Sequence, residues 1–203
     1  MDIRKETVCA GRMRIARKPV LRLLLLAGVS ACFDASALMV PLATTTLVDR
    51  ASCIVEGRVT GKAAHWTEDR SGIVTEVTLD VTDALLGDTN RVTFLYQGGR
   101  VDGLEQRVSD MPAVTNGQQV IVLLRQPAPS EERRRRLGAA SESLPVLVGS
   151  AQGLWRIGGG RAVKDRFTVA GDSRVIDRDV DAGVLKDFIR RRLSATRRTG
   201  GAP

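Results

Sequence analysis

The chain has 203 residues and a formal net charge of +8, and this charge is concentrated at its two ends. Residues 1–37 hold seven basic and three acidic residues, and residues 190–203 hold five arginines and no acid, so the body between them, with 19 basic and 20 acidic residues, has a net charge of −1. Only six aromatic residues follow position 37. Such a body lacks the basic groove and stacking surfaces of nucleic-acid-binding proteins, so we expect no nucleic-acid partner.

Segment 1–37 has the layout of a secretory signal peptide. Basic residues come first, the apolar run VLRLLLLAGVSACF (20–33) follows, and ASA at 35–37 supplies the small-x-small pattern that a signal peptidase needs. The apolar run is shorter than the roughly 20 residues that span a bilayer. We therefore expect an exported protein, periplasmic or extracellular, that is cleaved after Ala37.

The same segment allows a membrane-anchored alternative. The residues VSAC, 29–32, resemble the lipobox of bacterial lipoproteins, in which the cysteine, here Cys32, becomes the lipidated first residue of the mature chain. The arginine-rich C-terminal tail would then contact anionic lipid. We expect membrane contact only through lipidation at Cys32 or through this basic tail.

From residue 38 onward the pattern indicates one β-rich domain, 38–193. A threonine at 44 or 45 would cap a short helix, and segments with apolar residues at alternate positions follow it. The clearest alternation places β-branched and apolar side chains on one face of 73–81. Strands are expected in segments 53–66, 73–87, 91–97 and 118–126, with two or three more within 145–171.

The last part of the domain changes to helical spacing. Apolar residues recur at Val184, Leu185, Phe188, Ile189 and Leu193, which predicts an amphipathic helix. Residues 127–144, rich in Pro, Ser, Ala and charge, are expected to form a mobile surface insertion, and 194–203 a disordered basic tail. The predicted fold is mainly β, a small OB-like barrel or sandwich of five to seven strands with a short N-terminal helix and an amphipathic C-terminal helix.

Residues that carry catalysis or bind metals are scarce. His65 is the only histidine, and Cys53 is the only cysteine after position 37. A multi-histidine metal site and an internal disulfide are therefore excluded, and no G-x-S-x-G motif follows residue 37. Strand alternation directs Cys53 toward the core, where we expect a structural thiol. We expect no catalytic set, no cofactor and no metal site, so the protein is not expected to be an enzyme.

Residues 177–183, DRDVDAG, imitate the start of an EF-hand calcium loop. The sixth position should be Gly and is Ala182, and the twelfth should be Glu and is Phe188. Capping of the following helix explains these aspartates better.

The segment YQGGRVDGLEQRVSDMP, 96–112, is the stretch that most resembles a binding site. It fits neither a P-loop, which needs a lysine and a following helix, nor a Rossmann turn. Its glycines would supply unusual backbone angles in a long connection between strands, and Asp102 with Glu105 would form a one-turn capping box. The alternative is a recognition loop over 98–117, because long loops in compact domains are often functional. Its expected contact residues are Gly98, Gly99, Asp102, Gly103, Glu105 and Arg107.

Three runs together resemble a family of uncharacterised exported bacterial proteins: LVDRASCIVEGRV, GGRVDGLEQRVSDMPAVTNGQQVIVLL and VGSAQGLWRI. The family pattern reads A-D-x-I-V-x-G, then G-G-x-x-x-G-x-x-x-x-V-x-G-x-P-x-F-x-x-G-E-x-V-V-L-F-L, then G-x-x-Q-G, and the resemblance covers about residues 47–157. The chain departs from it at Ser52, Asp110, Val114, Gln118 and Leu123. The resemblance implies export and a β-barrel-like domain, without an established activity. The strand order also looks like OB-type barrels, including netrin-like modules that bind proteins.

These observations favour an exported, non-enzymatic binding domain. Its expected partner is another envelope or secreted protein, bound through the 98–117 loop. An envelope lipoprotein anchored at Cys32 with a structural role is the second hypothesis. A hydrolase that uses carboxylates alone is the third, although no pair of carboxylates stands out for it.

Overall fold

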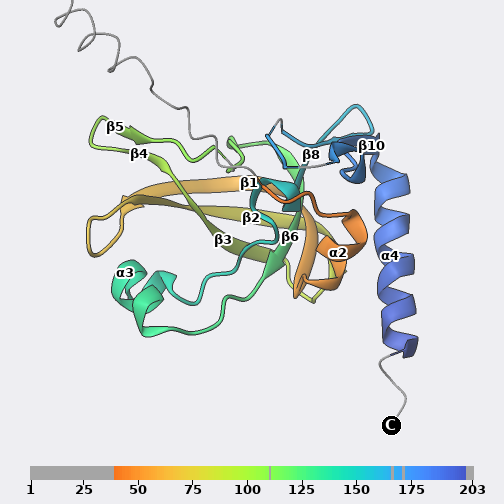
Figure 1. Ribbon diagram of the computed structural model, residues 1–203, viewed down its shortest axis with the longest axis horizontal. Helices are drawn as coiled ribbons and strands as arrows, with labels where there is room; N and C mark the ends of the chain where they lie inside the picture. Colours follow the sequence, from red (N-terminus) through yellow and green to blue (C-terminus); the bar gives the residue numbers. More distant parts are fainter. Residues whose placement is uncertain (1–38, 110, 166, 171, 200–203) are drawn as a thin grey trace, which may run out of the picture. The chain divides into compact units, whose positions relative to one another are not determined.

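The structure is a computed structural model that describes residues 39–109, 111–165, 167–170 and 172–199. The chain divides into two units, Met1–Ala35 and Ser36–Pro203, and all described residues belong to the second unit. This unit is mainly β, as the sequence predicts (Figure 1). Its described part contains ten strands and three helices.

Five strands have five residues or more: β1 (Cys53–Trp66), β2 (Ile73–Leu86), β3 (Arg91–Gln97), β6 (Gln119–Arg125) and β8 (Leu154–Gly158). The other five strands have two or three residues each: β4 (Gly99–Val101), β5 (Leu104–Gln106), β7 (Val146–Leu147), β9 (Arg161–Val163) and β10 (Asp179–Asp181). These short strands explain why the structure has ten strands where five to seven were expected. The helices are α2 (Thr44–Asp49), α3 (Glu131–Ser141) and α4 (Ala182–Thr199), with 3-10 turns η1 (Ser150–Gly153) and η2 (Ser173–Val175).

Five strands form a closed ring, so the barrel alternative holds rather than the sandwich. Strand β1 pairs antiparallel with both β2 and β6, β2 pairs with β3, and β6 pairs with β7. A parallel pairing of Leu95 with Val146 joins β3 to β7 and closes the ring. Strands β8, β9 and β10 continue the sheet from β6. Register shifts between β1 and β2 bend these long strands around the barrel, as closure of so small a sheet requires.

The barrel interior is filled by the alternating apolar residues of the ring strands. Val55 and Val59 of β1 face Val77 and Leu79 of β2, and Phe94 of β3 is completely buried among them. Each fully buried aliphatic side chain contributes about 1.5–3 kcal/mol relative to its exposed state. The period-two pattern in the sequence therefore identifies the inward face of these strands correctly.

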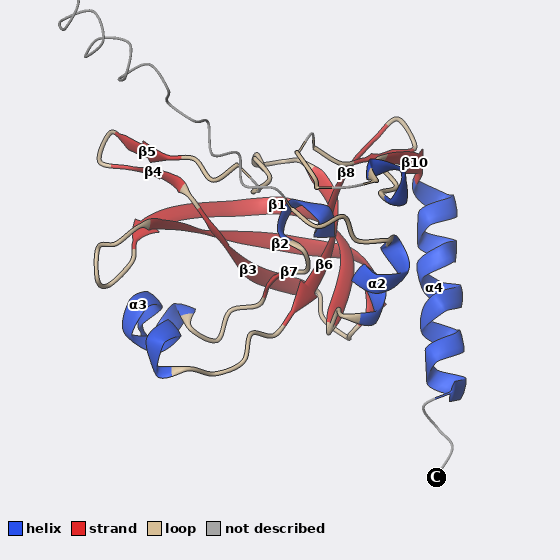
Figure 2. Cartoon of the chain, viewed as in Figure 1, coloured by secondary structure: helices blue, strands red, loops and turns tan. Residues whose placement is uncertain are grey.

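A second apolar layer lies outside the barrel, where helices α2 and α4 cover strands β1 and β6 (Figure 2). Leu185 and Ile189 of α4 are buried together with Ile54 and Leu123, whose side chains point away from the barrel interior. An ion pair between Arg192 and Asp49, 2.6 Å long, also connects the two helices. Strand β6 is therefore apolar on both faces, which matches its continuous apolar sequence.

Helix α4 extends beyond residue 193, the expected end of the domain. It begins after Asp181, whose carboxylate accepts a hydrogen bond from the backbone N–H of Val184 at 2.9 Å. It then continues to Thr199, so residues 194–199 are helical rather than part of a disordered tail. The hydroxyl of Ser194 donates to the carbonyl of Arg190 within this last part. Within the ranges that the structure describes, no helix combines the length and the apolar character that crossing a membrane requires.

Residues 127–144 were expected to form a mobile surface insertion, but they contain helix α3. Ser130 caps its N-terminus by accepting from the N–H of Arg133 at 3.1 Å. Its one strongly apolar contact is Leu137, which is 9% exposed and packs against Val74 and Leu95 on the outside of the barrel. The helix is kinked at Gly138, where φ is 76°. Leu137 follows six charged residues, so the sequence of α3 shows no helical periodicity of apolar residues. This explains why sequence analysis missed the helix.

Candidate functional site

The segment 98–117 begins with a β-hairpin. Strands β4 and β5 pair antiparallel, and Asp102 and Gly103 form the two-residue turn between them. Their φ angles of 51° and 78° are the positive values that a type I′ Asp-Gly turn needs. The expected capping box of Asp102 and Glu105 is wrong, because Glu105 lies in strand β5. Figure 1 shows the hairpin at one side of the barrel and helix α4 at the other.

Gly98 and Gly99 anchor the hairpin to the barrel. The carbonyl of Gly98 accepts a hydrogen bond from the buried Thr75 hydroxyl at 2.6 Å, and its N–H donates to the carbonyl of Ile73 at 2.8 Å. A Cβ atom on Gly99 would lie 2.4 Å from the same Thr75 oxygen and 2.9 Å from Cβ of Ala64. These two glycines therefore serve backbone geometry and close packing, as the conformational interpretation predicts, and position the rest of the loop.

The hairpin tip, residues 102–105, is exposed and combines charged and apolar side chains. Leu104 is 59% exposed, which the sequence analysis did not single out. The guanidinium of Arg107 donates to the carboxylate of Glu105 at 2.7 Å. This hydrogen bond lowers the pKa of Glu105 and raises the pKa of Arg107. Of the expected contact residues, Asp102, Gly103, Glu105 and Arg107 thus share one exposed surface.

A hollow of about 460 Å³ lies beside the hairpin. Its walls include Tyr96, Gln106 and Met111, so it separates the hairpin from the segment that follows. That segment is tied back to the barrel by Lys62 of β1, whose ammonium donates to the carbonyl of Val114 at 3.2 Å. The 98–117 segment is therefore held at both of its ends.

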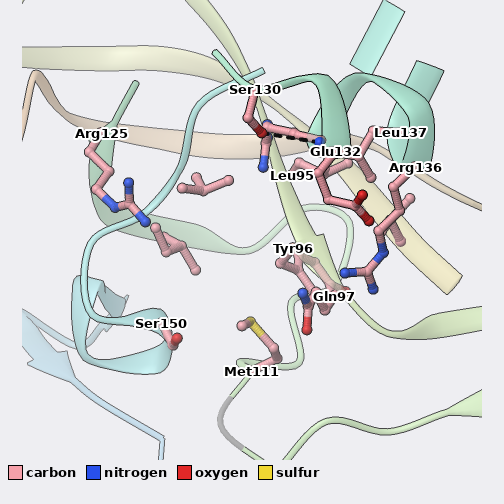
Figure 3. Close-up of a pocket in the computed structure, with 14 residues that line it drawn as sticks. Leu95, Tyr96, Gln97, Met111, Arg125, Ser130, Glu132, Arg136, Leu137 and Ser150 are labelled. Carbon is pink, nitrogen blue, oxygen red and sulfur yellow. Dashed lines mark hydrogen bonds between the residues drawn. The ribbon is translucent and has the colours of Figure 1, made fainter. Parts of the chain in front are cut away.

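A second hollow of about 470 Å³ lies between helix α3 and the junction of β3 with β7 (Figure 3). Arginines from two successive elements line it, Arg125 at the end of β6 and Arg136 in α3. We refer to it as the α3 pocket. Sequence reasoning missed it, because only the fold brings these residues together. The run of four arginines at 133–136 was the available signal, and it lies in the segment that was expected to form a mobile surface insertion.

The histidine pairs with a carboxylate rather than with a nucleophile. Nε2 of His65 lies 3.9 Å from Oε1 of Glu76, and the hydroxyl of Ser141 donates to that same oxygen at 2.7 Å. Activation of a serine requires a hydrogen bond from its hydroxyl to the imidazole, so this order of groups does not activate Ser141. Cys53 lies at the other end of β1 from His65, and burial raises the pKa of its thiol.

The aspartates that imitate a calcium loop each have another partner. The hydroxyl of Thr44 donates to Asp177 at 2.6 Å, Arg161 donates to Asp179 at 2.9 Å, and Asp181 caps helix α4. In the part of the chain that the structure describes, no group of three or more histidine, cysteine, aspartate or glutamate residues could hold a metal ion. Cys32, the lipidation candidate, lies outside the described residues.

Comparison with known proteins adds no family: no family model matches the chain, and no curated protein or solved structure is significantly similar to it. The resemblance of residues 47–157 to exported bacterial proteins therefore stays a prediction.

Proposed function

We propose that this protein is an exported, non-enzymatic binding domain that contacts another envelope or secreted protein through its hairpin tip. The observation that carries the proposal is the exposure of Leu104, 59% of its surface, on a turn whose base is packed into the barrel. Charged neighbours accompany it, since Asp102 in the turn, Glu105 in β5 and Arg107 directly after β5 are exposed. An apolar centre within a polar rim is the layout of many interfaces between proteins.

The anchoring of the hairpin favours binding because a rigid loop loses little conformational entropy when a partner docks. Three hydrogen bonds hold its base: Gly98 bonds with Thr75 and with Ile73, and the side-chain carbonyl of Gln106 accepts from the N–H of Ile73 at 2.5 Å. Among the described strands, β5 pairs with β4 alone. Its outer edge therefore offers backbone groups to which a partner strand can add.

Export rests on the signal-peptide pattern of residues 1–37, and contacts of the first described residues are compatible with cleavage after Ala37. The N–H of Met39 donates to the carbonyl of Thr168 at 3.3 Å, and the N–H of Ala170 donates to the carbonyl of Met39 at 2.8 Å. The N–H of Leu42 donates to the side chain of Gln152. Cleavage after Ala37 would leave all three contacts intact.

The test is affinity capture from the producing cell. The purified protein is immobilised and exposed to the envelope and secreted fractions of that cell, next to the variants Leu104→Asp and Val184→Asp. Val184 is the matched control, because it is 62% exposed and lies on α4, away from the hairpin. Circular dichroism confirms that each variant is folded.

We expect one protein to be retained by the native chain and by Val184→Asp, and to be lost from Leu104→Asp. Its affinity for Leu104→Asp should fall at least about tenfold, since truncation of a central contact residue commonly costs 2 kcal/mol or more. Equal retention by both variants would remove the hairpin tip from the binding surface. Retention of nothing by the native chain would contradict the binding function itself.

A further inference from the structure

The α3 pocket has an apolar floor. Leu95 and Tyr96 come from β3, Leu147 from β7, and Leu137 from the inner side of α3. Met111 closes one end of the pocket (Figure 3). The volume of about 470 Å³ lies within the range of small-molecule sites, about 300–1,000 Å³.

Two guanidinium groups reach this floor from opposite sides. Figure 3 shows the side chains of Arg125 and Arg136 directed into the pocket, Arg125 from the end of β6 and Arg136 from α3. Within the described ranges neither guanidinium has a carboxylate within 4 Å. The Nε atom of Arg136 is buried and has no hydrogen-bond partner among the described residues. A buried donor without an acceptor costs about 1–3 kcal/mol, so this arginine is held in place at a cost to the fold.

The backbone of Arg136 is fixed, which makes its side chain a positioned group rather than a free one. Its carbonyl accepts from the N–H of Glu68 at 2.8 Å. A third arginine of the pocket, Arg133, is already bound, since it donates to the carbonyls of Glu142 and Leu144 at 2.7 and 3.2 Å. Burial lowers the pKa of Arg133, and the nearby charge of Arg125 lowers it further. The pocket thus holds an excess of positive charge.

Two polar side chains complete the lining. The side-chain amide of Gln97 points into the pocket, and so does the hydroxyl of Ser150 (Figure 3). Ser150 has a φ of 56°, an uncommon conformation for a residue with a side chain. Such strain is often kept where a side chain must be held in place for binding. The one acidic residue of the lining, Glu132, is engaged by Arg135.

From this geometry we infer that the α3 pocket binds an organic monocarboxylate whose apolar body rests on the floor of Leu95, Leu137 and Leu147, with the carboxylate at the guanidinium of Arg136. A guanidinium matches a carboxylate in geometry and charge, and such charge-assisted hydrogen bonds are among the strongest in proteins. This inference goes beyond the proposed function, since the hairpin tip takes no part in it.

A carboxylate on an apolar body has two natural sources, a free fatty acid and the C-terminal residue of a peptide. Isothermal titration calorimetry of the purified protein distinguishes them with two acids, sodium octanoate and N-acetylphenylalanine. Each acid has a neutral counterpart of the same shape, octanol and N-acetylphenylalanine amide. The acid that binds more tightly identifies the source.

Arg136→Gln removes the proposed contact, Arg125→Gln removes the positive charge on the opposite side of the pocket, and Arg134→Gln is the matched control. Arg134 lies on the same helix, is exposed, and pairs with Glu142 outside the pocket lining. Arg125 is exposed, so Arg125→Gln tests the charge of the pocket even where Arg136→Gln weakens the fold.

We expect at least one acid to bind, with an affinity at least tenfold above that of its neutral counterpart. Arg136→Gln should weaken binding by about 10-fold or more, which corresponds to about 1.4 kcal/mol, Arg125→Gln should weaken it less, and Arg134→Gln should not change it. Binding should also weaken as salt is raised. Failure of both acids to bind overturns the inference. So does equal binding of acid and neutral counterpart, or an equal loss in all three variants. None of these results bears on capture by the hairpin tip.

Discussion

Replacement of Gly99 by alanine should destabilise the protein far more than replacement of Gly103, although both glycines belong to the same hairpin. The φ of Gly99 is 145°, a region that residues with a side chain rarely enter, at a cost of about 1–3 kcal/mol. The new Cβ would also lie 2.4 Å from the hydroxyl oxygen of Thr75 and 2.9 Å from Cβ of Ala64. Thr75 is fully buried, so this clash adds the usual cost of overpacking, about 1–3 kcal/mol.

We therefore expect Gly99→Ala to lower the free energy of unfolding by about 4 kcal/mol, the middle of the summed range. Gly103→Ala separates the two causes, because Gly103 has a positive φ of 78° but no heavy atom within 4 Å of its added Cβ. Its expected cost is about 1–2 kcal/mol. Urea unfolding followed by tryptophan fluorescence measures both. Equal costs for the two variants would refute the packing of Gly99 against the barrel.

Three further changes test other parts of the fold. Leu137→Ala should cost about 2–3 kcal/mol and speed amide hydrogen exchange in α3, because Leu137 is the main apolar contact of that helix. Lys186→Met should cost about 1–2 kcal/mol in urea unfolding, since it leaves the Glu56 carboxylate, 2.8 Å from the lysine nitrogen, without its cation. Burial lowers the pKa of Lys164 from 10.5 to about 7, so between these pH values the unfolded chain binds more protons than the folded one. Stability should therefore rise with pH across this window, and Lys164→Met should remove that rise; a native chain without the rise would contradict the burial of Lys164.

The long strands could be read from the sequence because their two faces differ. In β2, Val77 and Leu79 fill the barrel while Asp80 and Thr82 are partly or fully solvent-accessible, so an alternating pattern marks the strand and its inward face together. Helix α4 was readable for the same reason, since Leu185 and Ile189 recur on its buried face. Its continuation to Thr199 was missed because the last turns contain charged and small residues that contact little apolar surface.

Closure of the barrel was not readable from any segment. It depends on the pairing of Leu95 with Val146, where β7 is only two residues long. A strand of that length has no period of its own, and its partners are chosen by packing between distant parts of the chain. Sandwich and barrel therefore give the same local pattern, and the distinction appears only in the pairings of β7.

The two proposed binding surfaces also differ in how far the sequence could reveal them. The glycines and charged residues of 98–107 were visible in the sequence. Asp-Gly at 102–103 is a typical hairpin turn, but the segment was expected to be a loop. Leu104 was not singled out, because exposure of one leucine depends on the hairpin projecting from the barrel. The α3 pocket needed the fold, since Arg125 and Arg136 come together only through the junction of β6, β7 and α3.

Photo-cross-linking in the producing cell tests the central claim most directly. A photoreactive phenylalanine analogue replaces Leu104 at the hairpin tip, and in a second strain it replaces Val184 on α4, which is equally exposed. We predict a single prominent adduct with another envelope or secreted protein from the Leu104 position and none from the Val184 position. The same adduct from both positions, or no adduct from Leu104, would contradict binding through the hairpin tip.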